Sequence, residues 1–385
     1  MKNAIELADA TLGFGFVGAG AIAHFHARAV AAARGGRLVG VVSRSRASAE
    51  AFGMEHGVGF AGDSVEELLR QPGLDAVCIT TPSGLHFEPA MAAIRAGKHL
   101  MIEKPLDSTV EGTDHILREA ASAGVRVASV FQARFSDAAR AVKAAIQEGR
   151  FGRVVLASCY VKWNRATEYY TGWKGKLSED GGGAVINQAI HGVDLLQWFA
   201  GMPVEVFGWT TQRVHPIESE DTAVAALKFA SGAFGTIEAS TALWPGWSRR
   251  IEICGEHGSA VMEDDDITRW DFRVARPEDE KLRTIRESAA MGTGAAVPMN
   301  IKIEGDQRQI QDFIDSIREK RPFFVEGREA RNAVALVRAL YESAASGNPV
   351  RLAAVGQEEF AQQRLDRGDT ITVRDTNSMD GAVAR

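Results

Sequence analysis

The sequence predicts an α/β protein in which a doubly wound parallel sheet is followed by an α+β domain with a large, mainly antiparallel open sheet. Three observations support this prediction: a glycine-rich turn near the N-terminus, alternating apolar strands and helical stretches up to about residue 130, and consecutive extended runs from about 204 to 275. Strands that alternate with helices form parallel sheets, whereas strands joined by short turns pair antiparallel. The length of 385 residues also favours two domains.

The first domain is predicted over residues 13–130. Strands are expected within 13–18, 37–45, 75–83, 99–105 and 125–133, with a short extended element near 59–60, and helices within 19–32, 46–56, 64–71, 86–97 and 110–124. The apolar runs in the strands are those of buried parallel strands, and the glycines between them are typical of turns. This order is that of a dinucleotide-binding fold.

The second domain is predicted over residues 131–352, and residues 353–385 are expected to be a C-terminal tail or an arm onto a neighbouring subunit. Helices are expected at 136–149, 187–200 and 304–345, and strands at 204–212, 222–229, 234–242, 249–255 and 259–264. These consecutive strands are separated by short polar turns, which is the pattern of an antiparallel sheet.

Charge and composition exclude several classes of function. The net charge of −6 disfavours a nucleic-acid partner or an anionic membrane surface, because both need a basic face. Acidic residues near the N-terminus argue against a signal peptide, and no apolar run approaches the ~20 residues of a membrane span. Three cysteines without paired spacing suggest reduced thiols. We therefore expect a soluble cytoplasmic protein.

The turn VGAGAIA predicts a dinucleotide-binding site. Gly18 permits the tight turn, Gly20 lets the backbone approach a pyrophosphate, and Ala23 lets helix and strand pack closely. Ala21 and Ile22 open the helix, whose N–H groups and dipole favour phosphate. The pattern alone is weak, and a small-residue packing turn is the alternative, but the strand before it and the helix after it supply the context that the motif requires.

The second strand ends in Ser43-Arg44-Ser45-Arg46, which bears on the choice of cofactor. A fold that prefers NAD usually has a carboxylate here for the ribose 2′-hydroxyl, and that carboxylate is absent. Hydroxyl and guanidinium groups suit a 2′-phosphate instead. A solvated basic loop is the alternative. The sequence favours NADP over NAD.

Two further segments carry the chemistry. Glu103-Lys104-Pro105 follows a buried strand, where open α/β sheets bind ligands, and Asn187 and His191 share one helical face after three glycines. Each residue alone would more often be structural. Together they suit proton removal from an alcohol as hydride leaves its carbon, with lysine holding the oxygen and imidazole taking the proton. The histidines lack zinc-site spacing, so no metal is predicted.

The order GxGxxA, TPSGLH, EKPL and GGGAVINQAIHGVDLLQW resembles the glucose–fructose oxidoreductase / inositol dehydrogenase (Gfo/Idh/MocA) family over about residues 13–352. The resemblance implies an N-terminal Rossmann domain and a C-terminal domain for substrate binding and oligomerisation. It also implies a homodimer or homotetramer through the C-terminal sheet, and hydride transfer between NAD(P) and a hydroxyl of a sugar, cyclitol or sugar derivative.

The resemblance also implies roles for particular residues. Lys104 corresponds to the lysine that contacts both the nicotinamide and the reacting hydroxyl, and His191 to the acid/base histidine. Thr81, Pro82 and His86 correspond to the loop beside the nicotinamide ribose.

Three further positions follow from the same resemblance. Glu103 would lie under the cofactor, and Pro105 would follow a peptide bond that is often cis in the family. Asn187 departs from the pattern, because many relatives have aspartate there. Asparagine cannot take a proton but can bind substrate or orient the imidazole.

Residues 159–176 concentrate aromatic and basic side chains and are the candidate substrate segment. Arg165, Tyr170 and Lys174 are the candidate contacts, since aromatic faces pack on sugar rings and cations bind hydroxyl or acidic groups. The alternative is packing into the core or a subunit contact. The pair Trp244 and Trp247 could line the cleft or meet a partner, and the acidic run 263–266 is expected to be a solvated turn.

Two other functions remain open at this point. A redox-neutral glycoside hydrolase or lyase would hold NAD tightly and oxidise its sugar only transiently. A non-catalytic, cofactor-sensing regulator would share the fold, and the asparagine at 187 keeps that reading open.

Overall fold

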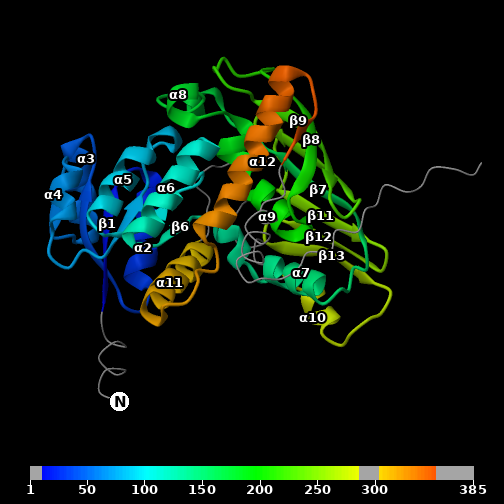
Figure 1. Ribbon diagram of the computed structural model, residues 1–385, viewed down its shortest axis with the longest axis horizontal. Coiled ribbons are helices and arrows are strands. Elements are labelled where there is room, and N and C mark those ends of the chain that lie inside the picture. Colours follow the sequence, from blue (N-terminus) through cyan, green and yellow to red (C-terminus); the bar gives the residue numbers. More distant parts are fainter. Residues whose placement is uncertain (1–10, 286–302, 353–385) are drawn as a thin grey trace, which may run out of the picture. The chain divides into compact units, whose positions relative to one another are not determined.

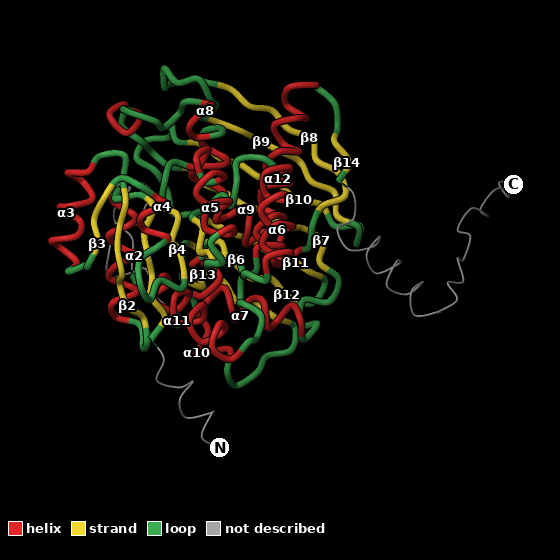
Figure 2. Tube along the Cα trace, turned by 60° about the vertical axis from the view of Figure 1, so that its left-hand side comes forward, coloured by secondary structure: helices red, strands yellow, loops and turns green. Residues whose placement is uncertain are grey.

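The computed structural model describes residues 11–285 and 303–352, and in them the chain forms two sheets (Figures 1 and 2). Sheet A is parallel throughout, with the order β3 (Phe60–Gly62), β2 (Gly36–Val42), β1 (Leu12–Val17), β4 (Ala76–Ile79), β5 (His99–Ile102), β6 (Val127–Ser129). This 3-2-1-4-5-6 order is that of a dinucleotide-binding Rossmann domain. The predicted fold class of this part of the chain, a doubly wound parallel sheet, is confirmed.

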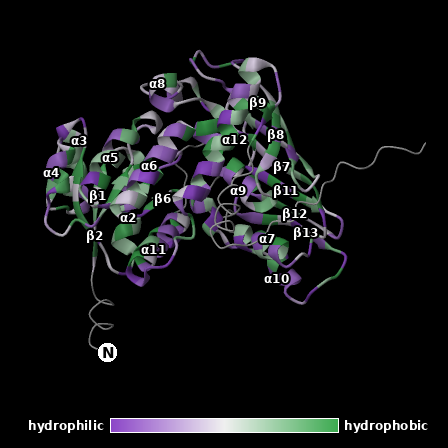
Figure 3. Ribbon diagram, viewed as in Figure 1, coloured by the Kyte–Doolittle hydropathy of each residue, from purple (hydrophilic) through white to green (hydrophobic). Residues whose placement is uncertain are grey.

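The helices between the strands of sheet A are α2 (Ala21–Ala32), α3 (Arg46–His56), α4 (Val65–Leu69), α5 (Phe87–Arg95) and α6 (Val110–Ala123). Several begin at a hydroxyl side chain that accepts a hydrogen bond from a backbone N–H of the first turn, as Ser45 does for α3 and Thr109 for α6. Figure 3 shows polar residues on α3 and α4, whereas β1 and β4 are buried along their whole length. The strands therefore form the core, and their carboxyl ends are available for a site.

Sheet B is mixed and mainly antiparallel. Its order is β13 (Asp266–Phe272), β12 (Gly258–Glu263), β11 (Arg250–Gly255), β7 (Val154–Lys162), β10 (Phe234–Ser240), β9 (Thr222–Phe229), β8 (Pro203–Thr211), β14 (Val350–Arg351). Among the described strands of sheet B, only β7 and β10 pair in parallel. In β9 burial alternates strictly from residue to residue, so one face of the sheet is covered and the other is exposed.

The covered face of sheet B packs against helices. The helices of this part of the chain are α7 (Asp137–Gln147), α8 (Leu177–Asp180), α9 (Ile190–Ala200), α10 (Asp279–Arg283), α11 (Glu304–Glu319) and α12 (Gly327–Ser346). Of these, α7, α9, α10 and α12 contact strands of sheet B, and Figure 1 shows α9 and α12 beside it. The predicted long helix at 304–345 is two helices, separated by residues 320–326.

Helix α11 packs on the first domain although it follows the second in sequence. It contacts α2, and its Ile310, Phe313 and Ile314 join the apolar cluster that contains Phe14 and Phe16. The Phe313 and Phe14 rings lie 5.8 Å apart between centroids. The chain therefore returns to the Rossmann layer within residues 131–352, the range that the sequence assigned to the second domain as a whole.

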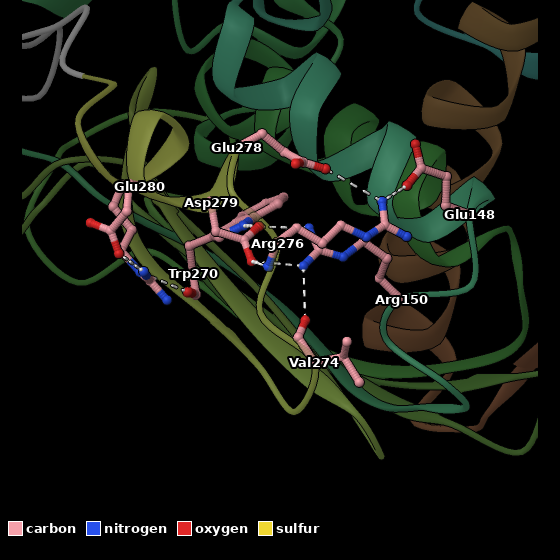
Figure 4. A network of polar contacts seen from close by, with 9 residues as sticks. Glu148, Arg150, Trp270, Val274, Arg276, Glu278, Asp279 and Glu280 are labelled. Atoms are coloured by element: carbon pink, nitrogen blue, oxygen red, sulfur yellow. Dashed lines mark hydrogen bonds and ion pairs between the residues drawn. The ribbon is translucent and has the colours of Figure 1, made fainter.

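A buried ion pair joins α10 to the segment that follows α7 (Figure 4). Arg150 donates to both carboxylate oxygens of Asp279, at 2.7 and 2.9 Å, and both side chains are nearly inaccessible to water. The Trp270 indole N–H and the Arg276 backbone N–H also donate to this carboxylate. The guanidinium hydrogen bond outweighs burial and lowers the pKa of Asp279. The charge is thus fully satisfied inside the fold, as a buried pair requires.

Among the described residues, every helix is too short or too polar to span a bilayer.

Candidate active site

A cavity of about 890 Å³ opens at the carboxyl edge of sheet A. Its walls come from the loops after β1, β2, β4 and β5 and from residues 163–191 of the second domain. Open α/β sheets bind ligands at this edge, where strand order reverses on either side of β1. This volume lies in the usual range for ligand pockets.

The glycine turn forms one wall of this cavity. Gly18 has φ +109, and a Cβ there would meet the Thr80 carbonyl oxygen at 2.7 Å, so only glycine fits without strain. At Gly20 an added Cβ would meet nothing within 4 Å, because this position opens onto the cavity. Ala21 and Ile22 begin α2 and also line the cavity. The open space in front of a helix N-terminus fits a pyrophosphate, whose charge the unpaired N–H groups would bind.

The loop after β2 places Ser43 and Arg44 on the cavity wall. The second arginine of this loop does not line the cavity, because the Arg46 Nε donates to Glu50 at 3.1 Å along α3. Arg44 is therefore the guanidinium within reach of a cofactor ribose at this edge.

The loop after β4 is divided between the cavity and the core. Thr81 and Pro82 line the cavity, whereas His86 does not and is buried. The His86 ring bridges two backbone carbonyls, with Nδ1 2.8 Å from the Pro105 oxygen and Nε2 3.0 Å from the Thr81 oxygen. Burial lowers the pKa of His86. The ring thus ties the Thr81 loop to the turn after Lys104, and a contact between His86 and the cofactor stays a prediction.

Lys104 follows β5 and lines the cavity, and the Lys104–Pro105 peptide bond is cis. The Lys104 Nζ donates to the Asn187 carbonyl at 2.6 Å, which joins the first domain to the second. Burial lowers the pKa of Lys104, while the charge of Glu103 opposes this shift. The ammonium is thus fixed at the cavity wall rather than extended into solvent.

Glu103 also lines the cavity, and its carboxylate accepts from the His26 ring at 2.6 Å and from the Lys104 backbone N–H at 3.1 Å. Burial alone would raise the pKa of Glu103, but the hydrogen bond and charge of His26 lower it to about 2. Burial lowers the pKa of His26, but the hydrogen bond and charge of Glu103 and the charge of Asp306 outweigh it and raise that pKa. On the far side of His26, Asp306 lies 3.7 Å from Nδ1, and burial raises its pKa to about 6.

His191 lies in the first turn of α9, directly after a π-helical turn at Ala184–Ala189 that carries Asn187. Both residues line the cavity, as their predicted shared face requires. Burial, then the charges of Lys104 and Arg249, lower the pKa of His191 to about 3. The imidazole is therefore neutral at physiological pH, and its Nδ1 is buried without a hydrogen-bond partner in the described part of the chain.

Asn187 is held by side chains that the sequence did not single out. Its Nδ2 donates to Asp180, and its Oδ1 accepts from Gln188 at 2.5 Å and from the Tyr169 hydroxyl at 3.4 Å. Asp180 is buried and also accepts from the Gly175 backbone N–H at 2.9 Å. Burial raises the pKa of Asp180, against these hydrogen bonds. A carboxylate thus stands beside position 187, although position 187 itself carries an amide.

The candidate substrate segment contributes to the cavity, but with one change of residue. Arg165 and Lys174 line it, whereas the Tyr170 hydroxyl donates to Thr241 at 2.6 Å and the ring lies off the cavity. Tyr169 lines the cavity instead, with the Lys174 ammonium 3.6 Å from the centre of its ring. Two adjacent tyrosines on a 3-10 turn point in different directions, and only the turn geometry decides which one faces the site.

The acidic run 263–266 also differs from its expected role. Asp264 and Asp265 line the cavity, where Arg249 donates to the Asp264 carbonyl at 3.0 Å and to the Asp265 carboxylate at 3.3 Å. Trp244 and Trp247 do not line the cavity and are 85% and 64% exposed.

One cluster of metal-ligand type lies outside the cavity. The His24 Nδ1 is 3.0 Å from the His56 Nε2 and 3.1 Å from a Glu55 oxygen. The two histidines come from different helices, which sequence spacing does not reveal. None of its three residues lines the active-site cavity. That the active site holds no metal stays a prediction.

Comparison with known proteins identifies the class. Residues 12–131 match the NAD-binding Rossmann fold of the GFO/IDH/MocA oxidoreductase family, and residues 139–261 match a GFO/IDH/MocA C-terminal domain. The chain is 36% identical to the 1,5-anhydro-D-fructose reductase of Ensifer adhaerens over 48% of this chain and 55% of that protein. It is 26% identical to the inositol 2-dehydrogenase of Rhizobium meliloti over 89% of this chain and 100% of that protein.

A solved structure is also similar over nearly the full length. It is the WlbA dehydrogenase of Bordetella pertussis in complex with NADH and UDP-GlcNAcA, with a TM-score of 0.82 and 32% identity, covering 90% of this chain and 99% of that one. The chain therefore belongs to the Gfo/Idh/MocA family of oxidoreductases. Its match spans about half the length of the Ensifer reductase.

Proposed function

We propose that the protein is an NAD(P)-dependent dehydrogenase or reductase that transfers hydride between nicotinamide and a secondary alcohol of a sugar, cyclitol or sugar derivative. The observation that carries the proposal is the meeting of Lys104 and His191 on the wall of a cavity that begins at a dinucleotide-type glycine turn. The charge of the Lys104 ammonium adds to burial in lowering the pKa of the His191 imidazole. The UDP-GlcNAcA bound to the Bordetella relative supports a sugar derivative as substrate.

The residues divide the work as follows. The bound nicotinamide supplies the hydride acceptor or donor. The Lys104 ammonium donates to the reacting hydroxyl oxygen and stabilises the negative charge that develops on it as hydride departs. The neutral His191 imidazole accepts the hydroxyl proton. The low pKa of His191 comes partly from the neighbouring Lys104 ammonium. Negative charge that develops on the substrate oxygen opposes this effect, so it raises the proton affinity of the imidazole at the moment of transfer.

For the cofactor, we propose a preference for NADP within this NAD-binding fold. Arg44 and Ser43 line the cavity where NAD-specific folds place a carboxylate. An Arg44→Glu variant should reverse the ratio of kcat/KM for the two cofactors, since it removes the cation for the 2′-phosphate and supplies the acid for the hydroxyl.

We also propose a homo-oligomer that forms through the open face of sheet B. Leu156 of β7, Phe234 of β10, Val224 of β9 and Trp209 of β8 are exposed on strands that pair with one another. A large exposed apolar patch on a sheet is typical of an interface, and a second copy supplies the same surface. We further propose a cytoplasmic location, where the three cysteines stay reduced.

The test is the absorbance of reduced nicotinamide when purified protein, with NADP or NAD, meets a panel of sugars, cyclitols, glycosides and sugar acids. A signal with one class supports the proposal. Lys104→Ala should then lower kcat by about 10²–10⁴-fold, the usual range for such a group, with the cofactor dissociation constant nearly unchanged. A panel without signal, together with tightly bound nicotinamide released on denaturation, would instead support a redox-neutral hydrolase or lyase.

A further inference from the structure

Lys174 lines the active-site cavity without a counter-charge of its own. Its ammonium lies 3.6 Å from the centre of the Tyr169 ring, and within the described part of the chain it forms no ion pair with a carboxylate. The Trp173 ring lies 5.9 Å away, and a lysine that packs on aromatic faces keeps its three N–H donors available. The side chain is half-buried, so water compensates its charge only in part.

Two more cations line the same cavity. Lys104 and Arg165 both act electrostatically on Lys174, and Lys104 gives one N–H to the Asn187 carbonyl. Arg165 donates to the Asn164 carbonyl at 2.9 Å and to the Gln188 side-chain oxygen at 2.7 Å, and it also has a side-chain hydrogen bond with Tyr169. We refer to Lys104, Arg165 and Lys174 as the cation cluster.

The nearby carboxylates do not neutralise this cluster. Glu103 is paired with His26, which carries the compensating charge, and Asp265 is paired with Arg249. Asp180 is the remaining carboxylate that acts on both lysines, and its hydrogen bonds go to Asn187 and to the Gly175 backbone. The groups that act electrostatically on Lys174 are two cations, Lys104 and Arg165, and one acid, Asp180, so positive charge is in excess around its ammonium.

The amide at position 187 preserves this excess. Asn187 Nδ2 donates to Asp180, so an aspartate at 187 would place two carboxylates in contact and one of them would have to hold a proton. The site therefore has one carboxylate, Asp180, beside the cation cluster, at a place where an aspartate at 187 would add a second.

We propose that the cation cluster binds an acidic group of the substrate, so that the enzyme acts on a sugar acid in preference to the neutral sugar. The inference rests on the proposed function. The acid oxygen accepts from the Lys174 ammonium, while Arg165 and Lys104 add attraction through a partly desolvated site, where charge–charge interactions are stronger than in water. The reacting hydroxyl lies between Lys104 and His191 on the same molecule.

The titration of Lys174 provides an internal check. Burial, then repulsion by Lys104, lowers the pKa of Lys174 to about 8, while Asp180 opposes and Arg165 adds to the shift. The ammonium is present below this pH and is lost above it. The kcat/KM for an acidic substrate, which reports the free enzyme, should therefore fall above pH 8 more steeply than that for a neutral substrate.

The experiment compares matched substrates that differ only in charge: glucuronate with glucose, galacturonate with galactose, and UDP-glucuronate with UDP-glucose. Glucose 6-phosphate tests whether a phosphate replaces the carboxylate. Variants Lys174→Met and Lys174→Arg are compared with Lys176→Met, an exposed lysine two residues away that pairs with Glu179 and does not line the cavity.

We expect at least one acid to exceed its neutral partner about tenfold or more in kcat/KM. Lys174→Met should reduce that ratio to near unity by raising KM for the acid, Lys174→Arg should restore most of it, and Lys176→Met should leave it unchanged. Neutral sugars that react as well as acids would overturn the inference while leaving the dehydrogenase proposal standing. A preference confined to glucose 6-phosphate would replace the carboxylate by a phosphate. A failure of all substrates to reduce nicotinamide would refute the proposed function itself.

Discussion

At the scale of single residues, the site depends on how each charge is compensated. Glu103 has its own cation in His26, Arg249 has Asp265, and Asn187 leaves Asp180 as the acid beside Lys104. Each side chain has an ordinary chemistry, but its protonation depends on its neighbour. The neutral imidazole of His191 is a consequence of burial next to two cations.

His191→Gln should lower kcat by about 10²–10⁴-fold, because the amide cannot take the hydroxyl proton. The cofactor dissociation constant, measured by fluorescence of bound reduced nicotinamide, should change little. His115→Gln is the matched control, since that histidine is exposed on α6, where it contacts Glu119 and the Phe87 ring away from the cavity. A His191→Gln enzyme with wild-type kcat would remove the imidazole from the proton transfer.

Asp306 should make the protein less stable above about pH 6. Burial raises the pKa of its carboxyl to about 6, so the folded state holds the proton more tightly than the unfolded chain, and stability falls as pH rises from about 4 to 6. Asp306→Asn removes this cost. We expect it to raise the free energy of unfolding by ~1–3 kcal/mol at pH 8 and to have no such effect below pH 4, as measured by urea denaturation. Equal stability of the two proteins at pH 8 would show that the buried carboxylate is compensated.

At the scale of elements, the π-helical turn at Ala184–Ala189 decides where Asn187 and His191 lie. Its backbone N–H groups at Gly183 and Val185 donate to the Glu220 carboxylate, at 3.0 and 2.9 Å, and Tyr341 donates to the same carboxylate. The turn is thereby anchored to sheet B and α12 before α9 begins. Single π-turns of this kind occur frequently at functional sites.

Gly183→Ala should disturb this turn. A Cβ at Gly183 would lie 1.9 Å from the Glu220 carbonyl oxygen, so the backbone must shift. We expect a loss of ~1–3 kcal/mol in the free energy of unfolding, together with a lower kcat from the displaced His191. Gly59→Ala is the control, because its Cβ would meet the nearest atom at 3.7 Å. An unaltered kcat in Gly183→Ala would show that the turn does not position the imidazole.

The Arg150–Asp279 pair offers a test remote from the site. Arg150→Met leaves a buried carboxylate with only the Trp270 and Arg276 donors, and we expect a loss of ~3–5 kcal/mol in the free energy of unfolding. The pKa of Asp279 is lowered in the folded state, so its contribution is present above the unfolded pKa and is lost as the pH falls toward the folded value. The difference between wild type and Arg150→Met should therefore shrink in acid.

At the scale of the whole molecule, one face of sheet B stays exposed to solvent although the two apolar cores are packed. Trp209 is paired in register with Val224 on that face, and Phe234 with Leu156. Isolated apolar residues at a surface are common, whereas these exposed apolar side chains form two cross-strand pairs on one face of the sheet.

Phe234→Glu combined with Val224→Glu should dissociate the oligomer. Charges buried against the same charges of a second copy repel and lose hydration. Light scattering coupled to gel filtration should show a dimer or tetramer for the wild type and a smaller species for the variant. A Val155→Glu variant tests whether the interface extends to the start of β7. A wild-type monomer would refute the proposed assembly.

Local sequence patterns were sufficient to predict the first domain. Apolar runs, glycine turns and helix caps are local signals, and the parallel order of sheet A follows from strands that alternate with helices. The same locality applies to Gly18, Lys104 and His191, because each stands at a fixed offset from the end of an element. His86 shows the limit of local patterns. A sequence does not distinguish a buried histidine that bridges two backbone carbonyls from a histidine that contacts a cofactor.

What the sequence by itself determined is therefore the class of fold, whereas the carboxyl-edge site and the lysine–histidine chemistry that it also predicted stay predictions. The tertiary structure decided which of Tyr169 and Tyr170 faces the cavity, that Asp180 stands behind Asn187, that Asp265 compensates Arg249, and that α11 returns to the Rossmann layer. The reason is physical: element type depends on neighbours a few residues apart, whereas burial, ion pairing and pKa depend on side chains that come together only when distant elements pack.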